Sequence, residues 1–247
     1  MREAPESSSG EGAPHRRRAR RVLPLPPARL VAAALALAAR EGLPGLTARK
    51  LGKTLGVEAM SIYHHFPSKR HLQDALVDHA IGTIVFPPPG PPLARLRALC
   101  VAYRAMAHRY AALYPLIGLH RLNTPAGVRF LERVLAIVHD VVPDAEQAAR
   151  RFRAIGYYLM GAAFDETAGY ARGPSAALPV DDAFVALHCP RLAAAAPYFT
   201  REEWDATFDA GLEAMLAGLA ADDGAARKPA RTRRARSTRG QPREPTS

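Results

Sequence analysis

The sequence predicts an all-α protein in which a small N-terminal three-helix domain precedes a larger helical domain. Apolar residues recur three and four positions apart along most of residues 27–221, the spacing of a buried helix face. One stretch at 46–66, LTARKLGKTLGVEAMSIYHHF, divides into two short helices at a glycine, as a helix-turn-helix does. The net charge of +11 is unevenly distributed: +3 over 1–26, +3 over 27–85, zero over 86–221 and +5 over 222–247. Basic character therefore belongs to the first 85 residues and to the tail.

Residues 1–26 have nothing to bury. They are rich in Ser, Gly, Pro and Arg and contain the run HRRRARR, so we expect a disordered basic arm. Such an arm either adds contacts to phosphates or is a solvated tail without a specific role. Two prolines end the arm, and a first helix follows with Leu30, Ala34 and Leu37 on one face and Gly42 at its end.

The stretch at 46–66 has the features of two short helices that join at a tight turn. Thr47 is suited to cap the first helix, because its hydroxyl can accept a hydrogen bond from the backbone. Gly56 stands where the chain must turn, and Gly52 removes bulk where the two helices approach. Apolar residues such as Ile62 supply the buried positions, so the other face of the second helix is left exposed.

This stretch, together with the PSKRHL sequence that follows it, resembles the DNA-binding helix-turn-helix of the tetracycline-repressor (TetR) family. In that family a Gly-Val turn precedes a recognition helix similar to SIYHHF. The resemblance implies a homodimeric transcription regulator, a repressor that a small-molecule effector releases from a palindromic operator in double-stranded DNA. It also implies a set of DNA-binding residues: Thr47, Arg49, Ala59, Met60, Ser61, Tyr63, His64 and Lys69.

Within this set, some side chains are suited to read base edges in the major groove. Arg49 can donate two hydrogen bonds to a guanine, and Ala59 and Met60 can pack on thymine methyl groups. Because Ala59 and Met60 form no hydrogen bonds with bases, more of the base-specific readout falls to Arg49, Ser61 and His64.

The remaining positions are suited to phosphates. Thr47, Tyr63 and Lys69 would hold the DNA backbone and fix the register of the recognition helix. Tyr63 has an alternative role, which is packing against the first helix. His64 and His65 do not suggest a shared metal ion, because neighbouring side chains on a helix point about 100° apart.

A helix over 69–85 is expected to connect the two domains. Pro67 ends the recognition helix and Ser68 can cap the connecting helix. The sequence FPPPGPP at 86–92 cannot be helical, so it separates a DNA-binding domain at 27–85 from a helical effector-binding and dimerisation domain at 86–221.

The second domain reads as helices with short breaks. Thr124 before a proline, the pair Asp144 and Gln147, and the pair Thr200 and Glu203 are capping signals. Expected helices cover 93–113, 125–142, 144–171 and 200–221, and a poorly periodic insertion at 172–199 includes a short helix near 182–187. Residues 222–247 are expected to be a disordered basic tail.

Two sites in this domain follow from the resemblance. In the family the last long helices pair with their copies, so we expect a dimer interface at Phe152, Ile155, Leu159, Ala163, Trp204, Phe208, Leu212 and Met215. The alternative is that these stripes form the core of a monomer. The candidate effector pocket consists of Tyr103, Met106, Tyr110, Phe130, Tyr157, Met160 and Phe164. The alternative for these residues is ordinary core, and the effector is not identified.

Other functional classes lack support in the sequence. It contains no glycine-rich phosphate loop, no HExxH, no nucleophile elbow and no paired-cysteine motif, so we expect no enzyme, no cofactor and no metal site. Two cysteines disfavour a disulfide framework, and no uncharged apolar run reaches the roughly eighteen residues of a membrane span. We expect a soluble cytoplasmic protein. The remaining alternative is a nonspecific nucleic-acid-binding protein that acts through its basic tails.

Overall fold

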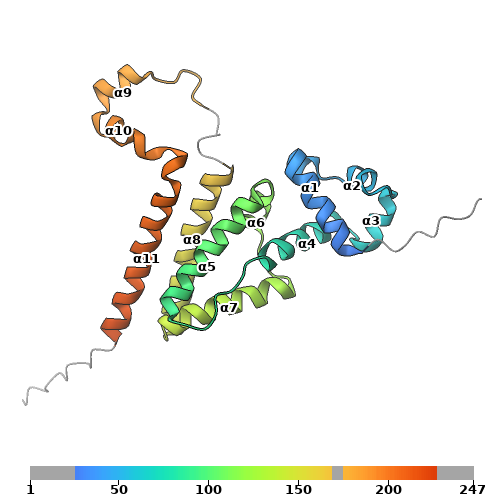
Figure 1. The fold of residues 1–247 in the computed structure, drawn as a ribbon, viewed down its shortest axis with the longest axis horizontal. Helices are drawn as coiled ribbons and strands as arrows, with labels where there is room; N and C mark the ends of the chain where they lie inside the picture. The colour runs from blue at the N-terminus through green and yellow to red at the C-terminus, as the bar shows by residue number, and fades with distance from the viewer. Residues whose placement is uncertain (1–25, 169–174, 227–247) are drawn as a thin grey trace, which may run out of the picture.

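The computed structural model describes residues 26–168 and 175–226, and within these ranges the chain is helical without a β-strand. The predicted all-α fold is confirmed. Figure 1 shows a small group of helices, α1 to α4, beside a body of longer helices. The α-helices are α1 (Pro27–Gly45), α2 (Ala48–Leu55), α3 (Ala59–His65), α4 (Lys69–Gly82), α5 (Pro92–Arg109), α6 (Tyr114–Leu119), α7 (Pro125–Val141), α8 (Ala145–Ala168), α9 (Asp182–His188), α10 (Pro190–Ala195) and α11 (Trp204–Ala226). Short 3-10 turns are η1 (Ala111–Leu113), η3 (Ala196–Phe199) and η4 (Arg201–Glu203).

The predicted basic arm and tail lie almost entirely outside the described residues. The exceptions are Pro26, which precedes α1, and residues 222–226, which the sequence assigned to the tail. These last residues continue α11, so this helix runs to Ala226 and not to the expected end at 221.

α1 holds the N-terminal unit together. Leu30, Ala34 and Leu37 are buried as the helical spacing predicted, and α1 contacts α2, α4 and η1. Gly42 has φ of 70°, a conformation that favours glycine, and it kinks the chain where the sequence predicted the end of the helix.

α2 and α3 meet at a tight turn. The hydroxyl of Thr47 accepts a hydrogen bond from the backbone N–H of Lys50 at 3.3 Å, which confirms the predicted cap. Gly56 has φ of 67° and ends α2 in the left-handed region. A Cβ added to Gly52 would lie 2.7 Å from the carbonyl oxygen of Val57, so glycine is needed for this close approach.

α4 is the element through which the N-terminal unit meets the body. Ser68 caps it by accepting a hydrogen bond from a backbone N–H of its first turn. α4 contacts α1 on the N-terminal side and α5, α6 and α7 on the other. It ends at Gly82, earlier than the expected residue 85, and residues 83–91 run without helix toward α5. Phe86 anchors this linker, because the guanidinium of Arg133 lies 3.6 Å from the centre of its ring.

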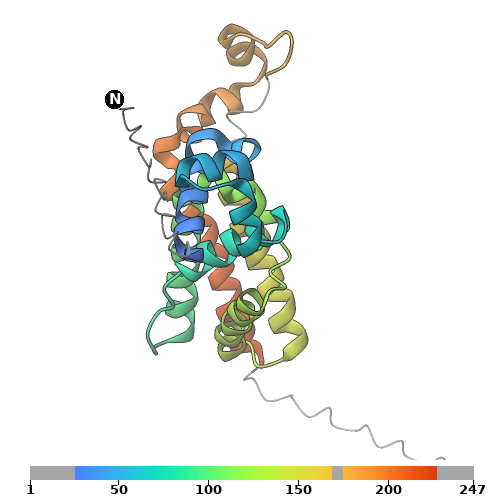
Figure 2. The same cartoon turned by 90° about the vertical axis from the view of Figure 1, so that its right-hand side faces the viewer.

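The body is a bundle built on α5, which contacts α7, α8 and α11. Viewed from the side of the N-terminal unit, this unit lies in front of the body (Figure 2). Tyr114 is fully buried at the start of α6, and its hydroxyl bonds with that of Tyr103 at 3.0 Å. α8 and α11 approach closely at Gly211, where a Cβ would lie 2.6 Å from the hydroxyl of Tyr158.

A segment of short helices projects beyond the body. α9 and α10 contact each other and lie above the N-terminal end of α11 in Figure 1. The predicted short helix near 182–187 corresponds to α9. Large apolar side chains remain exposed along this segment: Leu178, Val180, Phe184, Leu187, Leu192, Tyr198 and Phe199.

The predicted capping box of the last helix does not form. The side chain of Thr200 caps no backbone N–H, and the turn η4 intervenes before α11 begins at Trp204. By contrast, Asp144 accepts a hydrogen bond from the backbone N–H of Gln147 at 2.9 Å, as the other capping signal predicted.

Candidate DNA-binding surface and effector cavity

α3 has one buried and one exposed face. Ile62 is buried and fixes the helix on the N-terminal unit, whereas Met60 is 68% exposed and Tyr63 is 44% exposed. His64 is exposed beside them, and Ala59 and Ser61 are half-buried. The short helix therefore presents the same residue types that the sequence assigned to a DNA groove. His65 is half-buried, in keeping with a packing role.

Basic side chains flank this face on both neighbouring helices. Arg49 in the first turn of α2 and Lys69 in the first turn of α4 are exposed, as is Arg70. Within the part of the chain that the structure describes, Arg49 and Lys69 have no ion-pair partner. Lys50 differs, because it is 2.5 Å from a carboxylate oxygen of Glu41 and lowers the pKa of that carboxyl group. Arg49 and Lys69 are thus available to bind an external polyanion.

A cavity of about 540 Å³ lies in the body among α5, α7, α8 and the loop after α6. Among the predicted pocket residues, Tyr103, Phe130, Tyr157 and Met160 line it. Further lining residues are Leu96, Leu99, Cys100, Gly118, Leu119, His120, Arg121, Leu122, Leu131, Val134, Val138, Phe152, Arg153, Ile155, Gly156 and Leu159.

The other predicted pocket residues lie elsewhere. Met106 is buried in the core on α5. Tyr110 places its ring against His79 of α4, with the ring centres 6.1 Å apart. Phe164 packs edge-on against Tyr114 at 5.0 Å. These three residues do not line the cavity and pack as the ordinary-core alternative expects.

Two groups among the lining residues that the sequence missed differ in the signal that the sequence carried for them. Leu96, Leu99 and Cys100 continue the stripe of Tyr103 toward the start of α5, so the helical spacing carried a signal for them. Residues 118–122, at the end of α6 and in the loop after it, show no periodicity, and the sequence held no signal for their place in the wall.

Most residues of the predicted dimer interface make contacts within their own chain. Phe152, Ile155 and Leu159 face the cavity of their own chain. Ala163, Phe208 and Leu212 are buried in the core of one chain, and Met215 packs against that core while partly exposed. Of this set, the side chains of Ile155, Ala163, Phe208 and Leu212 are buried and offer no surface to a second subunit.

Trp204, the remaining residue of that set, is partly buried at the start of α11. Its ring lies 6.2 Å from that of His108 and 5.4 Å from the guanidinium of Arg201. It lines a shallow polar pocket on the body together with these two residues and with Arg104, Glu202 and Asp205.

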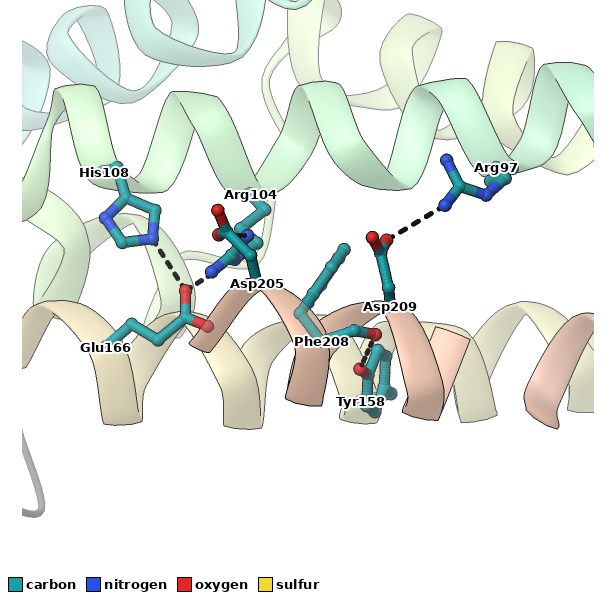
Figure 3. Close-up of polar contacts among 8 residues, drawn as sticks. All are labelled: Arg97, Arg104, His108, Tyr158, Glu166, Asp205, Phe208 and Asp209. Carbon is teal, nitrogen blue, oxygen red and sulfur yellow. Dashed lines mark hydrogen bonds and ion pairs between the residues drawn. The ribbon is translucent and has the colours of Figure 1, made fainter. Parts of the chain in front are cut away.

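Charged side chains connect α5 to α8 and α11 beside this pocket (Figure 3). Glu166 of α8 is buried, and its carboxylate oxygen accepts hydrogen bonds from Arg104 at 2.7 Å and pairs with His108 at 2.6 Å. Arg104 also donates to Asp205 of α11 at 2.7 Å. Nearby, the hydroxyl of Tyr158 donates to the carbonyl of Phe208 at 2.5 Å.

The loop between α6 and α7 is bonded to α4. His120 pairs through Nε2 with Asp74 at 2.9 Å, and its Nδ1 accepts the backbone N–H of Leu122 at 3.0 Å. Thr124 donates to Asp78 at 2.5 Å. The same loop supplies part of the cavity wall. It therefore connects the cavity to α4, the helix that follows the recognition helix α3.

Burial shifts the acid groups near the cavity toward their neutral forms. It raises the pKa of the Cys100 thiol to about 12. It also raises the pKa of the Tyr103 and Tyr114 hydroxyls, which bond with each other. At neutral pH these groups therefore carry no charge. Within the described residues, no group of three or more His, Cys, Asp or Glu side chains is arranged to hold a metal ion.

Known proteins share both parts of this fold. The model described as "Bacterial regulatory proteins, tetR family" matches residues 30–76, and "Tetracyclin repressor-like, C-terminal domain" matches residues 87–222. The chain belongs to the tetR family. Its relative tetracycline repressor protein class A from transposon 1721 of Escherichia coli is 31% identical over 208 residues, which cover 79% of this chain and 91% of that protein.

Solved structures of the family have the same architecture. Apo ActR from Streptomyces coelicolor matches with a TM-score of 0.68 and 25% identity, covering 83% of this chain and 99% of that one. ActR in complex with actinorhodin matches with a TM-score of 0.67 and 25% identity, covering 82% and 99%. The predicted family and the predicted function as a DNA-binding transcriptional regulator are confirmed. None of the described helices is both long enough and apolar enough to cross a membrane.

Proposed function

We propose that this tetR-family regulator is a homodimeric repressor in the cytoplasm, which an effector bound in the 540 Å³ cavity releases from an inverted-repeat operator. The two working parts are a DNA-binding domain at 27–85 and an effector-binding and dimerisation domain at 86–221. The observation that carries this proposal is that α4 is bonded twice to the loop between α6 and α7, which lines the cavity. Asp74 of α4 bonds with His120, and Asp78 of α4 accepts a hydrogen bond from Thr124.

The DNA-reading part of the proposal rests on the exposed face of α3. An α-helix fits the major groove, and the exposed Met60, Tyr63 and His64 would reach base edges and phosphates there. Arg49 and Lys69 flank the face and would bind a guanine and a phosphate respectively. One such helix reads only a few base pairs, so specificity calls for two copies held at a fixed spacing.

The effector part rests on the loop that joins the cavity to α4. Leu122 has φ of 50° in the left-handed region, which costs a residue with a side chain about 1–2 kcal/mol. The loop is therefore held in place by its contacts, among them the bond from Leu122 to His120. A ligand that displaces the cavity face of this loop pulls on Asp74 and Asp78, and so tilts α4 and the recognition helix attached to it. ActR, of similar fold, has been solved in complex with actinorhodin.

The dimer part rests on what a single chain leaves uncovered. The exposed sides of α8 and α11 carry small residues that let helices approach: Gly161, Ala206, Ala210, Ala214, Ala217 and Gly218. The exposed apolar residues of α9 and α10 add surface that is unfavourable in water. We propose these surfaces as the interface, in place of the buried stripes that the sequence suggested.

The test compares variants on a duplex selected from a random pool and on a scrambled duplex. Arg49→Ala should weaken binding to the selected duplex by roughly tenfold to a hundredfold and relax selectivity at one position. Arg129→Ala, an exposed arginine of α7 away from α3, is the control and should leave binding unchanged. An unchanged binding curve for Arg49→Ala would count against the docking described above.

The same assay separates the alternative of nonspecific binding through the tails. A chain reduced to residues 26–226 should keep its preference for the selected duplex and show a smaller dependence on salt, since arginines in the tails add phosphate contacts. If removal of the tails abolishes binding, or if the preference was never present, the tails and not α3 carry the activity.

A further inference from the structure

The charged residues in the cavity wall all have the same sign. Most lining side chains are apolar or aromatic, and the permanently charged ones are Arg121 and Arg153. Among the residues that the structure describes, no aspartate or glutamate lines this cavity, and neither does any serine, threonine, asparagine or glutamine. The wall thus offers a ligand extensive apolar contact and two cations, with no counter-charge for a positive group.

The neutral polar groups of the wall already have partners. Both ring nitrogens of His120 are engaged, one with a carboxylate of α4 and the other with a backbone N–H of its own loop. The hydroxyl of Tyr103 bonds with that of the buried Tyr114 at 3.0 Å. Cys100 is buried and uncharged at neutral pH. These groups therefore leave the recognition of a ligand's polar group to the arginines.

Arg153 is held at the open side of the cavity by Tyr157. Its guanidinium donates a hydrogen bond to the tyrosine hydroxyl at 2.8 Å and lies 5.0 Å from the centre of that ring. Both residues are exposed while they line the cavity, which places them at its mouth. A guanidinium has five N–H donors in a fixed fork, and the tyrosine accepts only one of them. The others can bind a planar anion such as a carboxylate.

Arg121 supplies the second cation from the loop after α6. It is exposed and lines the cavity, and within the described ranges it has no ion-pair or hydrogen-bond partner. Because it lies next to His120, which bonds to α4, an anion bound at Arg121 would act directly on the loop that joins the cavity to α4.

We propose that the effector is an anionic aromatic compound, a flat apolar ring system that carries a carboxylate. The ring system would lie between the apolar side chains of α5, α7 and α8, and the carboxylate would bind Arg153 at the mouth or Arg121 on the loop after α6. A cavity of about 540 Å³ is in the range that holds compounds of this size. This inference rests on the proposed function, since it names the class of ligand for the effector cavity.

The test uses three fluorescent probes that share one ring system: anthracene carboxylate, anthracene methanol and anthracene methylammonium. Their binding to the full chain without DNA is measured by fluorescence anisotropy. The carboxylate should bind about tenfold more tightly than the alcohol, because it gains hydrogen bonds with charged donors, and the ammonium should bind weakest. Arg121→Gln with Arg153→Gln should remove this preference and leave the affinity for the alcohol unchanged.

Two further variants locate the binding. Arg129→Gln is the matched control outside the cavity and should change no affinity. Gly156→Phe should weaken all three probes, because Gly156 lines the cavity and a Cβ there meets no atom within 4 Å, so the added ring would occupy space that the ligand needs. A melting temperature for each variant shows that the fold is retained.

Several results would overturn the inference. They are equal affinity for the three probes, no binding of any of them, or an unchanged carboxylate preference in the double arginine variant. Operator selection is a separate measurement, so a failure of DNA recognition is distinguishable. If the chain selects an operator but binds the alcohol most tightly, the proposed function stands and the anionic ligand is excluded.

Discussion

Glu166 offers a direct test of how the body is held together, because Arg104 joins one buried and one exposed carboxylate. The side chain of Glu166 is 4% exposed, whereas that of Asp205 is 89% exposed, and both lie 2.7 Å from the same guanidinium. Glu166→Gln removes the buried charge that pairs with Arg104 and His108. Asp205→Asn removes a similar contact that water can replace.

The two substitutions should therefore differ in free energy of unfolding. Removing one partner of a buried ion pair should lower the free energy of unfolding by about 3 kcal/mol here. This is the low end of the usual range, because Arg104 keeps its ion pair with Asp205. The exposed pair is worth at most about 1 kcal/mol. For a chain of this length, 3 kcal/mol lowers the melting temperature by roughly 6–12 °C.

The assay is urea unfolding followed by circular dichroism, at one protein concentration because the stability of a dimer depends on it. The midpoint should fall for Glu166→Gln and stay near that of the unchanged protein for Asp205→Asn. Equal midpoints for the two variants would refute the reasoning, because burial would then have no bearing on the strength of these contacts.

Other predictions concern the cavity thiol and the loop above α4. In the native protein iodoacetamide should alkylate Cys189 and spare the buried Cys100, and mass spectrometry should find both labelled only after unfolding. The pKa of Cys100 is raised from 9.0 to about 12, so its contribution to stability is complete below pH 9 and is lost as the pH rises toward 12. Between these two pH values the thiol should lower the free energy of unfolding by about 1.4 kcal/mol per pH unit. Cys100→Ala should therefore show a shallower dependence of stability on pH, and an identical dependence would exclude the thiol as the source. Gly127→Ala should destabilise the fold by about 1–3 kcal/mol, since its Cβ would clash with the backbone of Leu122. Gly156→Ala should stabilise the fold by about 0.5–1 kcal/mol, because it lies at an open helix position. Thermal melts that rank the two variants in the opposite order would contradict this.

Local chemistry made the N-terminal unit predictable. The cap at Thr47, the positive φ at Gly56 and the close approach at Gly52 are properties of single residues, and each is where the sequence indicated. The exposed face of α3 follows from them, because burial of Ile62 fixes which side of the helix points outward. Such features can be predicted from the sequence because the groups that contact each other are only a few residues apart.

The body was harder to predict, because an apolar stripe does not reveal what it faces. Phe164 and Tyr157 belong to the same helix, yet one packs in the core and the other lies at the mouth of the cavity. Similarly, Phe208 and Leu212 are buried in the chain's own core, which their apolar stripe alone did not reveal. The loop that bonds His120 to α4 has no periodic pattern at all, so only the folded chain shows this contact.

The central claim is that two copies of α3 read DNA in a sequence-selective way. The most direct test is selection of duplexes bound by the full chain from a random pool, followed by sequencing. We predict enrichment of an inverted repeat whose two halves are about one helical turn apart, or a multiple of it. The enrichment should be lost when Arg49 is replaced by alanine. Recovery of unrelated sequences with no repeat would contradict it.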